Sequence, residues 1–273
     1  MCFNVVIINP RKRDVRVPVL NLLDFMHTNH DGFSIYTVKN GKEMVYRTLD
    51  AKKFVEYIKE NVSYNELVHM HFRLASSGTV SLKNVHMWKL EDEDYTKSYY
   101  YVSHNGTVSK YSNFTYLDPK YAFWFDEIPV DYAKKFIKEI DEDIESDTLS
   151  FIKSEDFNDI VFNDVTQIES VLEKSGFYGV MFLTNPNEVI AISYRKPMYV
   201  IISNSVLYFS NTNIKEYVSK TKKIFGFNFK VALETTLYNT LVIFDVKRMM
   251  VKKTIKFAPP KYEHYYNAYY IDL

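Results

Sequence analysis

The stretch His71-Phe72-Arg73-Leu74-Ala75-Ser76-Ser77-Gly78, with Asn84-Val85-His86 after it, decides the fold predicted for this sequence. It continues an apolar run at residues 67–72 that predicts a strand. Taken alone, Arg73 is typical of a partly exposed cation at the end of such a strand. Its functional interpretation depends on the segment at the start of the sequence.

Residues 2–8 alternate and then become continuously apolar, which predicts a strand that begins at the second residue and is at least half buried. Cys2 is the single cysteine, so no intrachain disulfide is possible. A small residue after Met1 permits removal of Met1, which would leave Cys2 with both a thiol and a free α-amino group. These groups titrate near ~8.5 and ~8, so one residue can supply nucleophile and base. Otherwise, a lone cysteine on an apolar strand is simply a small buried hydrophobe.

The two segments together resemble the class II glutamine amidotransferases, the family of glucosamine-phosphate synthase, the purine amidophosphoribosyltransferase and asparagine synthetase. That family has His-Thr-Arg-Trp-Ala-Thr-His-Gly and, five residues later, Asn-Ala-His. The positions kept in register here are His71, Arg73, Ala75, Gly78, Asn84 and His86. Residues 30–32, 103–108 and 146–148 match further family segments in the same order, and the resemblance extends over residues 2–215.

The resemblance implies a site for each part of glutamine. Cys2 is expected to be the nucleophile, with Asn105 and the backbone of Gly106 stabilising the oxyanion. Arg73 suits the substrate α-carboxylate because a guanidinium can bond both oxygens, and Asp147 suits the α-ammonium. Without the resemblance, Asn105-Gly106 would be interpreted as a hairpin turn.

Other residues are expected to complete the pocket. Ser76 and Ser77 are expected to contact substrate, and the residues expected to support the site through hydrogen bonds are Asp31, His71, Asn84 and His86. The histidines are dispersed and lack carboxylates at defined spacing, so we expect no metal and no cofactor.

Several positions depart from the family pattern: Leu74 replaces Trp, Ser76 replaces Thr, Ser77 replaces His, and Leu149 replaces an acidic residue. These changes leave the substrate open between glutamine and another γ-glutamyl amide, such as a γ-glutamyl peptide. A catalytically silent binding or scaffold protein with the same fold is the third alternative. Since no synthase region is recognised, the ammonia acceptor is unknown, and a separate synthase subunit is a possible partner.

The predicted elements indicate an α+β protein, and the resemblance implies an αββα sandwich of the N-terminal-nucleophile (Ntn) hydrolase type with two mainly antiparallel sheets. Helices are expected after Asp50, after Asp131 and over residues 164–176. A turn is expected at Asn185-Pro186-Asn187. The expected strands are residues 2–8, 32–38, 67–72, 98–102, 179–183, 188–193, 198–203, 206–209, 231–237, 241–246 and 251–257.

Composition limits the partners. The chain has 34 basic and 34 acidic residues, so its formal net charge of +0 offers no electrostatic case for nucleic acid or an anionic membrane. The apolar runs are too short to span a bilayer, which predicts a cytoplasmic protein. We expect one amidotransferase-like domain at residues 2–255 and a Tyr-rich tail at 256–273 that docks on it or on a partner. The hairpin around residues 91–101 is expected to protrude as a lid or partner-binding element.

Overall fold

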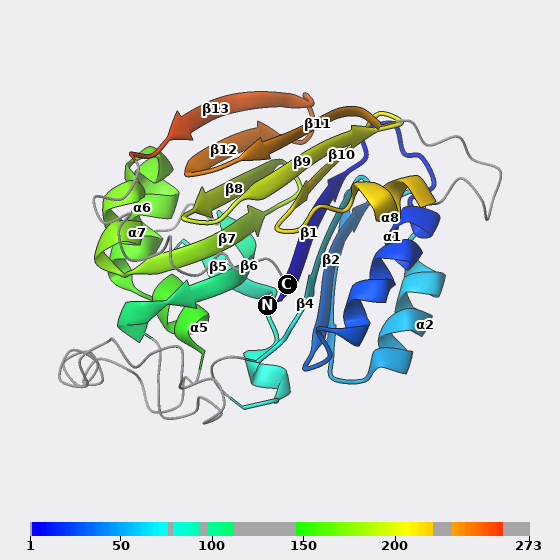
Figure 1. Ribbon diagram of the computed structural model, residues 1–273, viewed down its shortest axis with the longest axis horizontal. Coiled ribbons are helices and arrows are strands. Elements are labelled where there is room, and N and C mark those ends of the chain that lie inside the picture. The colour runs from blue at the N-terminus through cyan, green and yellow to red at the C-terminus, as the bar shows by residue number, and fades with distance from the viewer. Residues whose placement is uncertain (1, 76–78, 93–97, 112–145, 221–230, 259–273) are drawn as a thin grey trace.

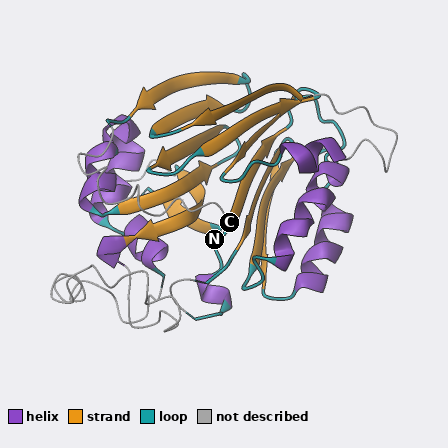
Figure 2. Cartoon of the chain, in the orientation of Figure 1, coloured by secondary structure: helices purple, strands orange, loops and turns teal. Residues whose placement is uncertain are grey.

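The computed structural model describes residues 2–75, 79–92, 98–111, 146–220 and 231–258. Two β-sheets are stacked face to face, and helices cover their outer faces (Figures 1 and 2). Every strand pair within the described ranges is antiparallel. The α+β sandwich of αββα type predicted from the sequence is therefore confirmed.

The first sheet has seven strands and the second has six. In spatial order the first contains β11 (Val231–Leu237), β9 (Met198–Ser203), β10 (Val206–Ser210), β1 (Phe3–Ile8), β4 (Leu67–Phe72), β2 (Phe33–Lys39) and β3 (Lys42–Thr48). The second contains β13 (Met250–Lys256), β12 (Thr240–Asp245), β8 (Glu188–Tyr194), β7 (Phe177–Thr184), β6 (Tyr99–Val108) and β5 (Trp88–Glu91).

Two groups of helices form the outer layers (Figure 1). Those beside the seven-stranded sheet are α1 (Arg16–Leu22), α2 (Ala51–Asn61) and α8 (Lys215–Lys220). Those beside the six-stranded sheet are α5 (Asp147–Ile152), α6 (Glu155–Asp164) and α7 (Glu169–Lys174). No helix in the described part of the chain is long and apolar enough to cross a membrane.

Strand β1 is the fourth of the seven strands in its sheet, between β10 and β4. Its side chains alternate between the two faces. Phe3, Val5 and Ile7 pack in a core cluster with residues of α1 and α2, whereas Val6 and Ile8 pack in a cluster with strands of the second sheet. Cys2 precedes this strand in the same alternation as Val6 and Ile8, which directs its side chain between the sheets.

Most predicted elements are confirmed, with shifts of a residue or two at their ends, except that the strand predicted at 98–102 extends to Val108 as β6. Asp50 caps α2 by accepting hydrogen bonds from the backbone N–H groups of Lys52 and Lys53. The helix expected over residues 164–176 is instead a 3₁₀ turn (Val165–Gln167) followed by α7. The elements that were not predicted are α1, α5, α6, α8, β3 and β5. The helix expected after Asp131 and residues 259–273 of the tail lie outside the described residues.

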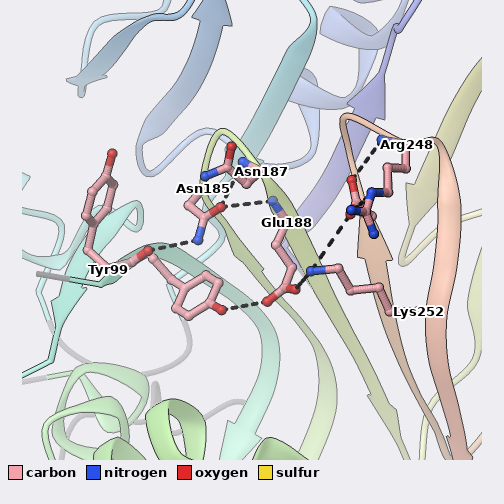
Figure 3. Close-up of polar contacts among 8 residues, drawn as sticks. Tyr99, Asn185, Asn187, Glu188, Arg248 and Lys252 are labelled. Atoms are coloured by element: carbon pink, nitrogen blue, oxygen red, sulfur yellow. Dashed lines mark hydrogen bonds and ion pairs between the residues drawn. The ribbon is translucent and has the colours of Figure 1, made fainter. Parts of the chain in front are cut away.

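The expected turn at residues 185–187 is present and joins β7 to β8. Asn185 Oδ1 accepts from the backbone N–H groups of Asn187 and Glu188, each at 2.9 Å (Figure 3). The Glu188 carboxylate then accepts from the Tyr100 hydroxyl at 2.7 Å and from Lys252 Nζ at 2.7 Å. The Glu188 side chain therefore links its own strand, β8, to β6 and to β13.

Asn105 and Gly106 lie within strand β6, so the hairpin-turn interpretation of this dipeptide is wrong. Gly106 is paired with Gly179 of β7. A Cβ on Gly106 would lie 1.8 Å from the Tyr178 carbonyl oxygen, and a Cβ on Gly179 would lie 2.4 Å from the Asn105 carbonyl oxygen. Both would also crowd the His104 ring, at 2.7 and 2.5 Å. The two strands approach too closely for any side chain here.

We expect Gly179→Ala to lower the free energy of unfolding by about 2–3 kcal/mol, because the methyl group meets backbone that cannot move aside. Gly41→Ala is the matched control: Gly41 has φ +72° but open space around it, so the expected loss is only about 1 kcal/mol. Urea denaturation of both variants measures the difference. Equal losses would contradict a steric requirement at the β6–β7 contact.

Candidate active site

One end of the space between the sheets is lined by polar side chains. At the other end this space is filled by an apolar cluster that includes Val6, Ile8 and Phe182. The polar residues that lie on the inward faces of β1, β4 and β6, or immediately beside these strands, are Cys2, Asn4, His69, His71, Arg73, Ser103 and Asn105. Most of these were predicted as site residues; Asn4, His69 and Ser103 were not.

Cys2 is held at the end of β1 by contacts on both sides. Its Sγ accepts from the Leu74 N–H at 3.3 Å and donates to the Leu74 carbonyl at 3.4 Å. The register pairs Phe3 with Phe72, so its continuation places Cys2 opposite Arg73. On the other side, Asn211 Nδ2 donates to the Cys2 carbonyl at 3.1 Å.

Burial raises the pKa of the Cys2 thiol. The backbone hydrogen bond from Leu74 and the positive charges of Arg73 and Lys196 act in the opposite direction. The thiolate is therefore favoured by its neighbours but disfavoured by its enclosure.

The loop after Arg73 is secured by the residues predicted to support the site. Arg73, which is 3% exposed, donates from Nη1 to the Thr79 carbonyl at 2.9 Å, and Asn84 Nδ2 donates to the same oxygen at 3.0 Å. The Asp31 carboxylate accepts from the Ala75 N–H at 2.8 Å. Asp31 and Asn84 thus anchor both ends of the loop. Ser76 and Ser77 lie outside the described residues.

Asp147 lies at the start of α5, next to the oxyanion segment of β6. Its Oδ2 accepts from the Val108 N–H at 2.8 Å, two residues after Gly106. Its Oδ1 accepts from the Thr148 N–H at 2.8 Å. The carboxylate is buried and fixed relative to the strand that carries Asn105 and Gly106.

His71 and His86 form a stacked pair, with ring centroids 3.8 Å apart and an interplanar angle of 3°. His86 Nδ1 accepts from the His104 N–H at 3.1 Å. Burial holds the pKa of both His71 and His86 well below the usual value, and nearby charge adds to this effect. Both rings are neutral near pH 7, which suits packing and hydrogen bonding.

Asn105 is 1% exposed, and its side-chain Nδ2 has no hydrogen-bond partner among the described residues. A buried amide donor without a protein partner is uncommon, because such groups are nearly always hydrogen-bonded. Asn105 is two residues along the inward face of β6 from Ser103, whose Oγ donates to Asn4 Oδ1 at 2.7 Å. The donor therefore lies in the polar space into which Cys2 and Asn4 project.

Lys196 is a site residue that the sequence analysis missed, although it lies in a segment that carries the resemblance. It is 6% exposed, between β8 and β9, and its carbonyl accepts from Ser193 Oγ at 2.5 Å. Burial lowers the pKa of Lys196 to about 8, while the nearby Cys2 thiol acts against this shift. The signal available in the sequence was a lysine placed between two strongly apolar strands.

Comparison with known proteins detects no relationship at the level of sequence: no protein-family model matches the chain, and no curated protein matches it. Solved structures do match. The chain is similar to the allosteric regulatory enzyme of purine biosynthesis, with a TM-score of 0.61 and 12% identity. The match covers 94% of this chain and 49% of that enzyme, so the chain spans about half its length.

Two further solved structures match over nearly their whole length. One is a glutamine aminotransferase class-II domain protein from Silicibacter pomeroyi (TM-score 0.46, 10% identity, 95% of this chain and 100% of that chain). The other is a predicted glutamine amidotransferase from Pseudomonas aeruginosa PA01 (TM-score 0.36, 10% identity, 93% and 96%).

The chain has the Ntn-hydrolase-like αββα fold, as its two sheets and helical layers define it. The similarity to the allosteric regulatory enzyme of purine biosynthesis supports the fold that the sequence resemblance implied.

We expect Lys196→Met to raise the pKa of the Cys2 thiol, because the positive charge of Lys196 favours the thiolate. The rate of iodoacetamide alkylation measured against pH would then rise at higher pH than in the wild type. Lys196→Arg keeps the charge and should retain the wild-type profile or shift it to lower pH. An unchanged profile in Lys196→Met would show that the lysine does not influence the thiol.

Proposed function

We propose that this protein hydrolyses the side-chain amide of glutamine, with Cys2 as the nucleophile after removal of Met1, and releases ammonia and then glutamate. The observation that carries the proposal is the unpartnered amide donor of Asn105, buried in the polar space that Cys2 faces. An enclosed donor of this kind is what a developing oxyanion requires. The fold supports the same class of reaction.

In the proposed reaction the Cys2 thiolate attacks the amide carbon, and the α-amino group of Cys2 transfers the thiol proton to the departing ammonia. Negative charge on the former amide oxygen is stabilised by Asn105 Nδ2 and the Gly106 N–H, each worth about 3 kcal/mol. Water then hydrolyses the thioester, which returns the thiol and releases glutamate.

We propose Arg73 and Asp147 as the groups that bind the amino-acid end of the substrate. Arg73 donates to the Thr79 carbonyl, yet a guanidinium has five N–H donors and can also bond a carboxylate. The Asp147 carboxylate is fixed beside β6, because its oxygens accept the backbone N–H groups of Val108 and Thr148. Both side chains are buried, and their charges are opposite to those of the substrate α-carboxylate and α-ammonium. Ser76 and Ser77 remain proposed contacts.

The leaving group is the part of the proposal that these contacts do not define. A γ-glutamyl peptide has the same α-carboxylate and α-ammonium as glutamine, so Arg73 and Asp147 serve both. Comparison of glutamine with γ-glutamyl dipeptides, by release of glutamate, distinguishes the two. If glutamine is preferred, a separate ammonia-accepting synthase subunit is the proposed partner.

We expect a glutamine-mimicking diazoketone to label Cys2 stoichiometrically, with intact-mass analysis reporting both the adduct and the loss of Met1. Arg73→Ala should slow labelling by about 10- to 150-fold, since a charged hydrogen bond is worth about 1.5–3 kcal/mol. Arg11→Ala, at an exposed position, is the control and should leave the labelling rate unchanged. Cys2→Ser should abolish the adduct.

Labelling that is indifferent to Arg73 would indicate a merely reactive thiol and would favour the catalytically silent binding or scaffold protein. Retention of Met1 in the mature protein would remove the proposed base.

A further inference from the structure

Three side chains between the sheets carry buried polar atoms for which the described residues offer no hydrogen-bond partner. The atoms are Asn4 Nδ2, both ring nitrogens of His71, and Asn105 Nδ2. Asn4 and His71 are 0% exposed and Asn105 is 1% exposed. Such groups are rarely left unpaired in folded proteins, so three of these side chains between the same two sheets indicate a shared ligand.

The three side chains lie together. Asn4 and His71 are direct cross-strand partners in β1 and β4, and their side chains share the inward face. Across the sandwich, Ser103 contacts both Asn4, at 2.7 Å, and His69, at 2.5 Å. Asn105 is two residues beyond Ser103 on β6, and His71 is two residues beyond His69 on β4. Asn105 and His71 therefore lie at the same level between the sheets, on the same side of the Ser103–His69 contact.

The hydrogen-bonding capacity of the group fits one water molecule. Burial holds the pKa of His71 well below its usual value, so the neutral ring has one N–H donor and one bare nitrogen. Asn4 and Asn105 each present N–H donors. A water that accepts from the two amides and donates to the bare nitrogen makes three hydrogen bonds, the usual number for a buried water. The remaining ring nitrogen of His71 is then the one beside the His104 backbone, whose contact acts to raise the pKa of His71.

We infer that Asn4, His71 and Asn105 bind a buried water molecule behind Cys2, and that this water positions the Asn105 amide as an oxyanion donor. The second part rests on the proposed function. An amide NH₂ group has two N–H donors, so one can be held by the water while the other faces the reacting carbonyl. Asn4 and His71 are then positioning residues.

A series of buried hydrogen bonds orients the side chain of Asn4. His69 contacts Thr184 Oγ1 through Nδ1 at 2.8 Å and Ser103 Oγ through Nε2. Burial lowers the pKa of His69 to about 3, so the ring is neutral and has one donor. With Nε2–H donating to Ser103, the serine hydroxyl donates to Asn4 Oδ1, which turns the Asn4 NH₂ group away from Ser103.

The water itself can be tested without any enzymatic activity. A high-resolution crystal structure of the full chain should show ordered density about 2.7–3.2 Å from Asn4 Nδ2, Asn105 Nδ2 and a ring nitrogen of His71. His71→Phe should lower the melting temperature, because it removes a satisfied polar group. If no water is bound, His71→Phe should instead raise the melting temperature, because phenylalanine replaces a ring whose nitrogens lack partners. Absent density, or a higher melting temperature, would overturn the water site.

The positioning role needs a kinetic readout. With glutamine as substrate, Asn4→Leu and His71→Phe should each lower kcat by about 10- to 100-fold while KM changes less than about twofold, because the Arg73 and Asp147 contacts remain. Asn65→Leu is the matched control: this buried asparagine lies just before β4, beyond the end opposite Arg73. It should lower the melting temperature and leave kcat unchanged.

An equal fall of kcat in Asn65→Leu would assign the effect to general destabilisation and overturn the positioning role. If the wild-type protein does not hydrolyse glutamine, the proposed function fails and the positioning role with it. In that case the density and the His71→Phe melting temperature still decide whether the water site exists.

Discussion

The alternation of side chains along the central strand β1 is the constraint on which the rest of the structure depends. Because β1 lies in the middle of one sheet and under a second sheet, both of its faces are buried. One face can be wholly apolar, since it meets only helices. The other must be apolar where the sheets pack and polar where Cys2 begins the strand, and this division places a reactive group inside a protein core.

The architecture could be predicted from the sequence because the periodic apolar segments are long and the residues that cap helices and form turns are easily recognised. Some elements depend only on residues close in sequence, so tertiary contacts do not change them. Examples are the strand at residues 2–8, the Asp50 cap and the turn at 185–187. The elements that were missed, such as the edge strands β3 and β5, are short or partly exposed, so neighbours rather than internal pattern determine them.

The candidate site was predictable only in part, for a related reason. The resemblance to a known family pointed to Cys2, Arg73 and Asn105. Their positions relative to one another depend on which strands pair and how the two sheets stack, and the hydrophobic periodicity of the sequence does not reveal this. Asn4 and Lys196 gave little signal, because one polar residue in an apolar strand is ambiguous until its neighbours across the sandwich are known. The Asn105-Gly106 dipeptide shows the converse: its turn propensity was overridden by close packing against Gly179.

The clamp that Asn211 places on the start of β1 has a consequence for the timing of folding. Asn211 is 209 residues from Cys2 in sequence, and its side chain also accepts from the Asn4 N–H at 2.6 Å. Contacts between such distant residues form only after the intervening chain has been synthesised. The two hydrogen bonds of Asn211 can therefore form only after β10 has been synthesised, so the start of β1 is not held on both sides until late in translation.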